Sequence, residues 1–321
     1  MAKNNYSLIT TSQLAKICRV SQGTVDRALN NRSGINSKTK QHILDAAKKY
    51  GYSPNLSTVA GSGSKSMLYG MVLFDLNNDY FSRFIMDFEI LCKKIGYNSI
   101  VMFTHNDLQT EIGCINQLVH LGVDGIVLCS VGKGEEYGSF LKSLKIPIVT
   151  IGNRIENIPF VGVNDYCAMR DITRYAIDKG YREFVYYAPV LRKRETENIY
   201  AQEERYRAFL DEAQKRGMKH CLAVNQEELI SVIKQGSRCA VLCPSDAYAI
   251  RALNIIREVR LEGVGVMGFD NCDILKKGNI NIDSLAYNHA TFAELIYARL
   301  KEEISDETEY VEHTIVSRGS M

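Results

Sequence analysis

The 321-residue sequence predicts a small all-α head followed by an α/β body with two doubly wound parallel-sheet subdomains. Three observations predict this fold class. Helix caps and helical apolar spacing fill the first 56 residues, and a Gly- and Ser-rich stretch follows at residues 57–66. From Leu68 onward, apolar strand-like runs alternate with amphipathic helices in two successive series. A chain of this length is also too long for one core and suits two or three domains.

The head contains signals for three helices. Thr10 followed by Gln13 forms a capping-box pattern, while Ser21 and Ser37 are expected to cap the second and third helices. Apolar residues recur at helical spacing and are expected to face inward: Leu14, Ala15 and Ile17, then Val25, Ala28 and Leu29, then Ile43, Leu44 and Ala47. Because only a few residues separate the first two helices, the pattern predicts a helix-turn-helix bundle.

Charge is divided unevenly along the chain. Residues 1–66 hold ten Lys and Arg but only two acids, Asp26 and Asp45, so this segment carries +8. The whole chain carries +2, which leaves −6 for the remainder. A basic head on an acidic body is the electrostatic layout of a nucleic-acid binder, because phosphate contacts dominate non-specific affinity. A solvated basic surface is the alternative interpretation of the same charge.

The body repeats the order strand, helix, strand. The expected strands are residues 68–74, 98–103, 125–131 and 146–152 in the first series, then 183–189, 239–245 and 264–270 in the second. The helices expected between them are residues 80–97 and 110–123, then 168–181, 202–217 and 247–259. Polar and aromatic residues cluster where these strands end. Because ligands bind beyond the carboxyl ends of such strands, we expect a binding cleft between the two halves.

Several segments together carry a family resemblance. They are "SQLAKICRVSQGTVDRALNNRSGINSKTKQHILDAAKKYGYSPN" in the head, then "DLNNDYF", "GVDGIVL", "IPIVTIG", "CPSDAYAIRAL", "GFDN" and "TIVSRGS" in the body. With them the chain resembles the lac-repressor/galactose-repressor (LacI/GalR) family of transcription factors over essentially its whole length. The resemblance implies a periplasmic-binding-protein-like body and a cytoplasmic repressor that acts as a homodimer. Its expected partners are a near-palindromic double-stranded DNA operator and a small-molecule effector, a neutral sugar or polyol.

With this resemblance we expect a helix-turn-helix domain at 1–56, a hinge or linker at 57–67 and an effector-binding, dimerising body at 68–321. The N-subdomain is expected at about 68–163 plus 288–305, and the C-subdomain at about 164–287 plus 306–321. The family hinge motif Ala-Arg-x-Leu, which wedges leucines into the minor groove, is replaced by Thr58, Val59, Ala60 and Gly61. Leu56 or Val59 would have to take its place.

The resemblance also implies which head residues contact DNA: Ser21, Gln22, Gly23, Thr24, Asp26, Arg27 and Asn30. Arg27 suits guanine and Gln22 suits adenine in the major groove, while Thr24, Asn30 and the Ser21 amide would hold phosphates. Asp26 replaces a small hydroxyl residue. It is expected either to accept from cytosine or to pair with a neighbouring base-reading side chain. Arg19 stands at a turn position that commonly holds glycine, so some backbone strain is expected there.

The ligand-binding residues implied by the resemblance are Asn78, Tyr80, Phe81, Asn153, Arg154, Asn164, Asp165, Gln202, Ser245, Asp246, Asp270 and Tyr287. Carboxylates and amides there suit vicinal hydroxyl groups. Taken alone, each residue has an alternative interpretation as an ordinary polar group at a strand end or helix cap. Gln202 replaces an arginine that often grips the effector, and Arg205 stands where that motif has glycine. The neutral Gln202 therefore argues against a strongly anionic effector.

Other classes of protein find little support in the sequence. It has no GxSxG, P-loop or HExxH motif, no GxGxxG after the first strand, and no histidines at metal-ligand spacing. We therefore expect no enzyme activity, metal or cofactor, and we expect its nine cysteines to be reduced. No apolar run is long enough to span a membrane. A solute-binding protein for sugar uptake is the main alternative, but the basic head and the absence of a secretory-type N-terminus oppose it.

Overall fold

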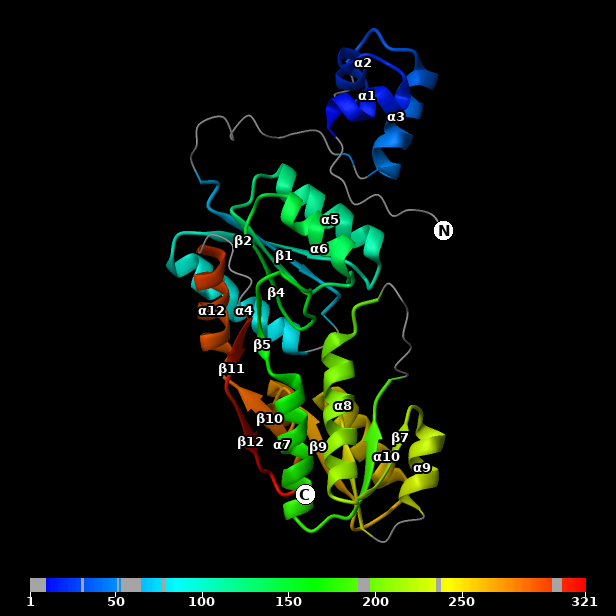
Figure 1. Cartoon of the computed structure of the whole chain (residues 1–321), viewed down its shortest axis with the longest axis vertical. Coiled ribbons are helices and arrows are strands. Elements are labelled where there is room, and N and C mark those ends of the chain that lie inside the picture. Colours follow the sequence, from blue (N-terminus) through cyan, green and yellow to red (C-terminus); the bar gives the residue numbers. More distant parts are fainter. Residues whose placement is uncertain are drawn as a thin grey trace.

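The computed structural model describes residues 10–29, 32–50, 52, 65–76, 79–189, 197–234, 238–301 and 308–321. Asn30, Asn78 and the hinge residues Leu56 and Thr58–Gly61 lie outside the described residues. Figure 1 shows a helical head at one end of the molecule and two α/β subdomains that follow one another along its long axis. The expected fold class is thereby confirmed.

Three helices form the head: α1 (Thr11–Cys18), α2 (Gln22–Leu29) and α3 (Ser37–Lys49). The capping box is confirmed, since the Thr10 side chain accepts from the Gln13 amide and the Gln13 side chain accepts from the Thr10 amide. The Ser21 hydroxyl accepts from the Thr24 amide at 3.1 Å, as a cap of α2 should. Leu14, Val25 and Ile43 form the centre of a small apolar core.

Two local expectations in the head were wrong. Ser37 is the first residue of α3 rather than its cap, because the Asn36 side chain accepts from the Lys38 amide at 2.8 Å and ends the preceding loop. Ile17 is 41% exposed instead of buried, because Leu14, Ala15 and Cys18 already cover the side of α1 that faces the core. Arg19 adopts the left-handed conformation (φ 55°), so the expected strain at this turn position is present.

The N-subdomain contains a six-stranded sheet in the order β11-β5-β4-β3-β1-β2, with parallel pairing throughout. Its strands are β1 (Leu68–Leu73), β2 (Asn98–Phe103), β3 (Gly125–Leu128), β4 (Ile148–Thr150), β5 (Phe160–Val163) and β11 (Thr308–Val311). Helices α4 (Asp79–Lys94) and α12 (His289–Lys301) pack on one face of the sheet. Helices α5 (Leu108–His120) and α6 (Glu135–Ser143) pack on the other.

The C-subdomain sheet has the order β12-β10-β9-β8-β6-β7, and only the β10–β12 pair is antiparallel. Its strands are β6 (Glu183–Tyr187), β7 (Lys219–Ala223), β8 (Cys239–Leu242), β9 (Gly265–Phe269), β10 (Asp283–Tyr287) and β12 (His313–Val316). Helices α7 (Asp165–Asp178) and α8 (Tyr200–Lys215) cover one face, and α9 (Gln226–Ile233) and α10 (Asp246–Glu258) the other. The short α11 (Asp273–Lys277) follows β9.

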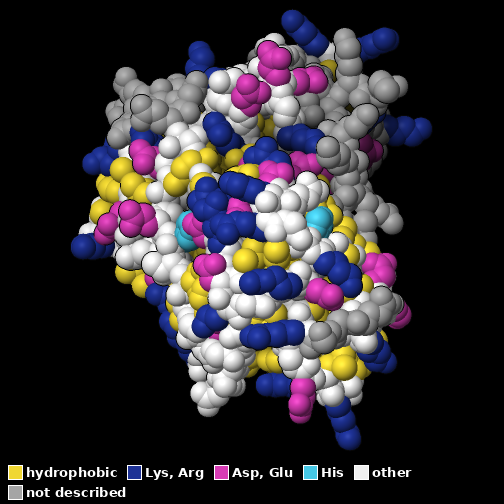
Figure 2. Space-filling model, turned by 60° about the horizontal axis from the view of Figure 1, so that its bottom comes forward, with side chains coloured by type: hydrophobic (Ala, Val, Ile, Leu, Met, Phe, Trp, Pro, Cys, Tyr) yellow, Lys and Arg dark blue, Asp and Glu magenta, His cyan; other side chains and the backbone are white. Residues whose placement is uncertain are grey.

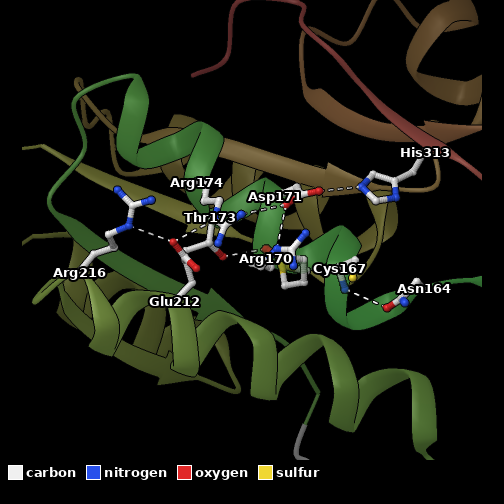
Figure 3. A network of polar contacts seen from close by, with 10 residues as sticks. Asn164, Cys167, Arg170, Asp171, Thr173, Arg174, Glu212, Arg216 and His313 are labelled. Carbon is white, nitrogen blue, oxygen red and sulfur yellow. Dashed lines mark hydrogen bonds and ion pairs between the residues drawn. The ribbon is translucent and has the colours of Figure 1, made fainter.

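A polar network joins α7 to α8 and to the start of β12 (Figure 3). The buried Glu212 carboxylate forms ion pairs with the guanidinium groups of Arg174 and Arg216, each at 3.0 Å. Burial works to raise the pKa of Glu212, but these two arginines outweigh it and leave that pKa below its ordinary value. Asp171 pairs with His313 at 3.2 Å. The network thus joins α7, α8 and β12 to one another within the C-subdomain.

The chain crosses between the subdomains at residues 163–165, 287–289 and 311–313. The expected boundary at residue 306 was wrong, because β11 pairs in parallel with β5, from Thr308 opposite Phe160 to Val311 opposite Val163. Residues 308–311 therefore belong to the N-subdomain, and only β12 joins the C-subdomain sheet. Among the described residues, no helix is both long and apolar enough to traverse a lipid bilayer.

Candidate functional site

A cavity of about 260 Å³ lies between the two subdomains, at the carboxyl ends of their strands. Eight of the residues expected to bind a ligand line this cavity: Tyr80, Phe81, Asn153, Asp165, Gln202, Ser245, Asp270 and Tyr287. They come from the first turns of α4, α7 and α8 and from the ends of β4, β8, β9 and β10. The parallel order of the strands brings these distant segments to one edge of each sheet, as expected.

Arg205 is the central charged residue of the cavity, and the sequence analysis did not place it among the ligand-binding residues. Its Nε lies 2.7 Å from an Asp165 carboxylate oxygen, and its Nη1 donates to the Pro244 carbonyl at 2.5 Å. The guanidinium carbon also stands 3.6 Å from the centre of the Phe269 ring, a cation–π contact. This guanidinium is therefore already held by a carboxylate, a carbonyl and an aromatic face.

The helical position of Arg205 explains its inward direction. It stands three and four residues before Ala208 and Phe209, which are fully buried against the C-subdomain sheet. Residues spaced in this way share one face of a helix. Burial lowers the pKa of Arg205, but the nearby Asp165 and Asp270 outweigh that effect and hold its pKa above the ordinary value. Arg205 therefore remains charged.

Asp270, a carboxylate in the cavity wall, has an unusual backbone conformation. It directly follows β9 with φ at 94°, a conformation that L residues rarely adopt, and its amide donates to the Leu285 carbonyl. Tyr287 donates its hydroxyl to Asp270 at 3.4 Å. Burial raises the pKa of Asp270 to about 6, against the opposing effect of Arg205. Strain of this kind is concentrated at functional sites, and here it aims a carboxylate oxygen into the cavity.

Aromatic rings form much of the remaining wall. The ring of Tyr80 lies 5.0 Å from that of Phe81 and 6.2 Å from that of Tyr287, centre to centre. Phe74, Phe160 and Tyr248 also line the cavity. Apolar rings beside a few fixed polar groups are typical of a small-molecule site. Beyond Tyr80, Asp270 and Tyr287 lies a second hollow of about 600 Å³, which these three residues share with the inner cavity.

Three of the other expected ligand-binding residues do not line the cavity. Arg154 is exposed outside it. Asn164 caps α7, accepting from the Cys167 amide at 3.0 Å. Asp246 accepts from the Cys272 amide and from the Ser284 hydroxyl, each at 2.6 Å, and burial raises its pKa to about 7. In the structure Asn164 and Asp246 therefore match the alternative interpretation: they are polar residues at strand ends that hold the surrounding loops.

Asn153 lies in the cavity wall, but its side chain is already hydrogen-bonded within the protein. The amide nitrogen donates to the carbonyls of Ser130 and Asn198, and the amide oxygen accepts from the Ala201 amide. Both N–H donors of this amide and one of the two lone pairs on its oxygen are thus used within the protein. The bonds to Asn198 and Ala201 join the two subdomains.

The second helix of the head presents a polar face to solvent. Ser21, Gln22, Gly23 and Arg27 are exposed, and Thr24 is half-buried with its hydroxyl 2.8 Å from that of Ser21. Ser21 caps α2 and the other four residues lie on its first two turns, the part of a recognition helix that meets base edges. The arrangement suits insertion into a major groove.

Asp26 forms an ion pair with Arg32, at 3.2 Å. The sequence analysis expected it either to accept from cytosine or to pair with a neighbouring base-reading side chain. Arg32 belongs to the loop that follows α2. This pairing reduces the repulsion that an isolated carboxylate would exert on DNA phosphates.

Charge elsewhere on the surface is more mixed. Figure 2 looks toward the end of the body remote from the head, and acidic side chains stand among basic ones there. Several of the arginines of the C-subdomain pair with acidic partners, as Arg174 and Arg216 both do with Glu212. Among the described residues, no group of three or more His, Cys, Asp or Glu side chains is arranged to hold a metal ion.

A helix-turn-helix head joined to a two-lobed body with a ligand-sized cavity defines a ligand-responsive DNA-binding regulator. Comparison with known families agrees with this class. Residues 12–55 match the bacterial regulatory proteins of the lacI family, and residues 67–232 match the periplasmic binding proteins and sugar binding domain of the LacI family. Residues 173–321 match a periplasmic binding protein-like domain. The chain belongs to the lacI family of transcriptional regulators. The head match does not favour the alternative of a solute-binding protein.

Two curated relatives are transcriptional regulators by name. The HTH-type transcriptional regulator RegA of Clostridium acetobutylicum is 31% identical over 274 residues, which cover 80% of this chain and 81% of RegA. Catabolite control protein A of Staphylococcus xylosus is 26% identical over 193 residues, 60% of this chain and 59% of that protein.

Solved structures share the fold. The lac repressor dimer bound to operator and the anti-inducer ONPF has a TM-score of 0.70 at 15% identity, covering 98% of this chain and 99% of that one. The transcriptional regulator CelR–cellobiose complex has a TM-score of 0.66 at 18% identity, covering 98% and 100%. At these identities the likeness concerns the fold.

Proposed function

We propose that this protein is a homodimeric repressor whose two heads bind the halves of a near-palindromic double-stranded DNA operator. A small neutral sugar or polyol, bound in the cavity between the subdomains, controls that binding. The observation that carries the proposal is the presence in one chain of an exposed polar face on α2 and a polar, aromatic-lined cavity between two lobes. A two-fold dimer matches a two-fold operator. No catalytic role is proposed for the acidic residues of the cavity.

The polar groups of the cavity favour an uncharged effector. Arg205 is the cationic side chain in its wall, and Asp165 already neutralises it at 2.7 Å. Gln202 is neutral, and Asp270 adds a carboxylate that would repel an anion. Hydroxyl groups can donate to Asp270 and accept from Gln202, while the rings of Tyr80 and Phe81 cover an apolar sugar face.

The size of the cavity favours a single ring. Its volume of about 260 Å³ lies just below the range of about 300–1,000 Å³ that is usual for drug-sized ligands. A longer molecule would have to pass Tyr80 and Tyr287 into the second hollow. Control of DNA binding then follows from linkage, because an effector that prefers one arrangement of the subdomains must change the population of the other.

The function is tested by selecting bound sequences from random DNA with the full-length protein at two salt concentrations. An inverted repeat that survives at the higher salt is expected, because base contacts depend on salt less than phosphate contacts do. A panel of monosaccharides, polyols and disaccharides is then added to the selected operator complex. Salt-sensitive binding without sequence preference, or no response to any neutral sugar, would contradict the proposal.

Replacing Asp270 with alanine is expected to remove the effector response and to leave operator binding intact. The change deletes a carboxylate that hydrogen-bonds hydroxyl groups in the cavity, and a lost bond to a charged group costs about 1.5–3 kcal/mol. Effector affinity should therefore fall by about tenfold to a hundredfold, measured by calorimetry. Asp273→Ala is the matched control, because Asp273 lines the outer hollow but not the inner cavity. A normal response in Asp270→Ala would remove Asp270 from the site.

Effector affinity is expected to fall as the pH is lowered from 7.5 to 5. Burial raises the pKa of Asp270 to about 6, so the carboxylate that accepts hydroxyl donors becomes protonated in this range. At pH 5 the affinity should be about tenfold lower than its plateau value. Asp270→Asn should flatten this pH dependence. A wild-type affinity that stays constant down to pH 5 would mean that Asp270 does not accept from the effector.

Unfolding does not explain such a loss. The pKa of Asp270 in the folded protein is raised above its unfolded value, so folding takes up protons between about pH 4 and pH 6. This group therefore adds stability as the pH falls through that window, and the contribution is absent above it. The pKa values of Asp107 and Asp283 are lowered in the folded protein. Protonation of these two carboxylates therefore weakens the fold only when the pH falls below their ordinary pKa range. The thermal midpoint at pH 5 provides the check.

A further inference from the structure

We propose that Asn198 and Asn153 form a latch that holds the two subdomains together and positions the first turn of α8 over the cavity. The latch rests on the proposed function in one respect: the cavity that it closes is the proposed effector site. It lies where the N-terminal end of α8 reaches the N-subdomain. Figure 1 draws α8 on the side of the body away from β11 and β12, which carry the chain between the subdomains. Closure would thus be held on the side remote from these crossing strands.

Asn198 makes the contacts from the C-subdomain side. Its backbone amide donates to the Val131 carbonyl at 2.8 Å. Its side-chain nitrogen donates to the carbonyls of Gly132 at 3.1 Å and Arg154 at 3.0 Å. Its side-chain oxygen accepts from the Tyr200 amide at 3.2 Å, which fixes the rotamer at the start of α8. The residue is only 6% exposed, so these bonds lie in a dry contact.

Asn153 makes the reciprocal contacts from the N-subdomain side. Its side-chain nitrogen donates to the Asn198 carbonyl at 2.6 Å, and its side-chain oxygen accepts from the Ala201 amide at 3.3 Å. Asn153 is also 6% exposed. Together the two asparagines account for five hydrogen bonds between the subdomains, donated in both directions.

The loop that receives Asn198 is held rigidly by a buried carboxylate. Glu111, on α5, accepts from the amides of Val131 at 2.7 Å and Gly132 at 3.2 Å. It also accepts from the hydroxyls of Ser130 at 2.9 Å and Tyr137 at 2.5 Å. A side chain at position 132 would lie 2.6 Å from the Tyr137 ring, so glycine is required there. Two of the three carbonyls that Asn198 uses, those of Val131 and Gly132, are therefore preorganised by contacts within the N-subdomain.

The latch has a direct consequence for the cavity. The first two turns of α8 supply Ala201, Gln202 and Arg205 to its wall, and the amide of Ala201 is itself a latch donor. If the latch opens, this wall moves away from the residues of the N-subdomain. Because the released groups become hydrated by water, each bond contributes modestly to closure, and the latch remains reversible. The five latch bonds themselves join uncharged amide and carbonyl groups.

The test compares Asn198→Ala with the wild-type full-length protein, with no sugar added. Small-angle X-ray scattering reports the separation of the subdomains, and amide hydrogen exchange reports residues 197–201. We expect a larger radius of gyration and about tenfold faster exchange of the Ala201 amide in the variant. Asn225→Ala is the matched control, because the Asn225 side chain caps α9 within the C-subdomain. It should leave both measurements unchanged. Identical scattering and exchange in Asn198→Ala and wild type would overturn the latch.

Two further variants separate a latch from a general loss of structure. Asn198→Asp keeps the acceptor for Tyr200 but removes both side-chain donors, so it should open the protein as Asn198→Ala does. Either alanine change alone removes two of the five bonds, and Asn153→Ala combined with Asn198→Ala removes four, so the double variant should be at least as open as either single variant. A double variant as closed as the wild type would overturn the proposal. These measurements use no sugar, so their outcome does not depend on whether the protein responds to one. Likewise, a result that overturns the latch does not overturn the proposed effector site.

Discussion

Replacing Arg27 with alanine is expected to abolish sequence-specific operator binding while the fold and the effector affinity remain unchanged. Arg27 is exposed on α2, while its helical neighbours Val25 and Ala28 supply the buried contacts of that helix. A bidentate arginine–guanine contact contributes about 1–3 kcal/mol of discrimination, and a dimer makes it twice. The loss of about 2–6 kcal/mol corresponds to at least about 30-fold weaker binding to the selected operator.

Lys38→Ala is the matched control for Arg27→Ala. Lys38 is exposed on the first turn of α3, so this change removes the same charge from the head without touching α2. It should weaken binding to the operator and to scrambled DNA about equally, because phosphate contacts carry no sequence information. The measured quantity is the ratio of the two affinities at two salt concentrations. A ratio that Arg27→Ala leaves unchanged would show that Arg27 does not read bases.

Local patterns in the sequence predicted most of the fold. The capping box at Thr10 and the apolar strands have causes within a few residues of chain, so they can be read from the sequence. The strand at 308–311 could not be assigned in this way. Its pairing with β5 joins residues far apart in the sequence, and nothing in "TEYV" distinguishes one sheet edge from the other. The boundary at residue 306 was therefore misplaced.

The site was predictable in position but not in the role of each side chain. The rule that ligands lie beyond strand ends places Asp246 and Asp270 equally well. Only the three-dimensional structure distinguishes them. Asp270 has a φ of 94° and lines the cavity, whereas the Asp246 carboxylate accepts from the Cys272 amide and the Ser284 hydroxyl. Arg205 was missed because the family motif has glycine at that position. Its spacing from Ala208 and Phe209 carried the signal that it faces inward.

Arg205→Met is expected to destabilise the protein by about 3–5 kcal/mol, the usual cost of removing one partner of a buried ion pair. The Arg205 side chain is 16% exposed and pairs with Asp165 at 2.7 Å, so its loss leaves that carboxylate buried without a cation. The contact with the Phe269 ring is lost as well. Denaturant unfolding of the full-length protein measures the effect as a change in the midpoint at constant slope.

The pair of Arg83 with Asp87, in which the arginine is exposed, provides the matched comparison. Arg83 is 49% exposed and pairs at 2.8 Å, so Arg83→Met should cost less than about 1 kcal/mol. Adding Asp165→Asn to Arg205→Met should recover much of the lost stability, because the uncompensated charge is then removed. That recovery distinguishes a charge effect from a packing defect. If Arg205→Met and Arg83→Met cost the same, or if Asp165→Asn restores nothing, the Arg205–Asp165 pair does not set the electrostatics of the cavity, and the argument for an uncharged effector loses its main support.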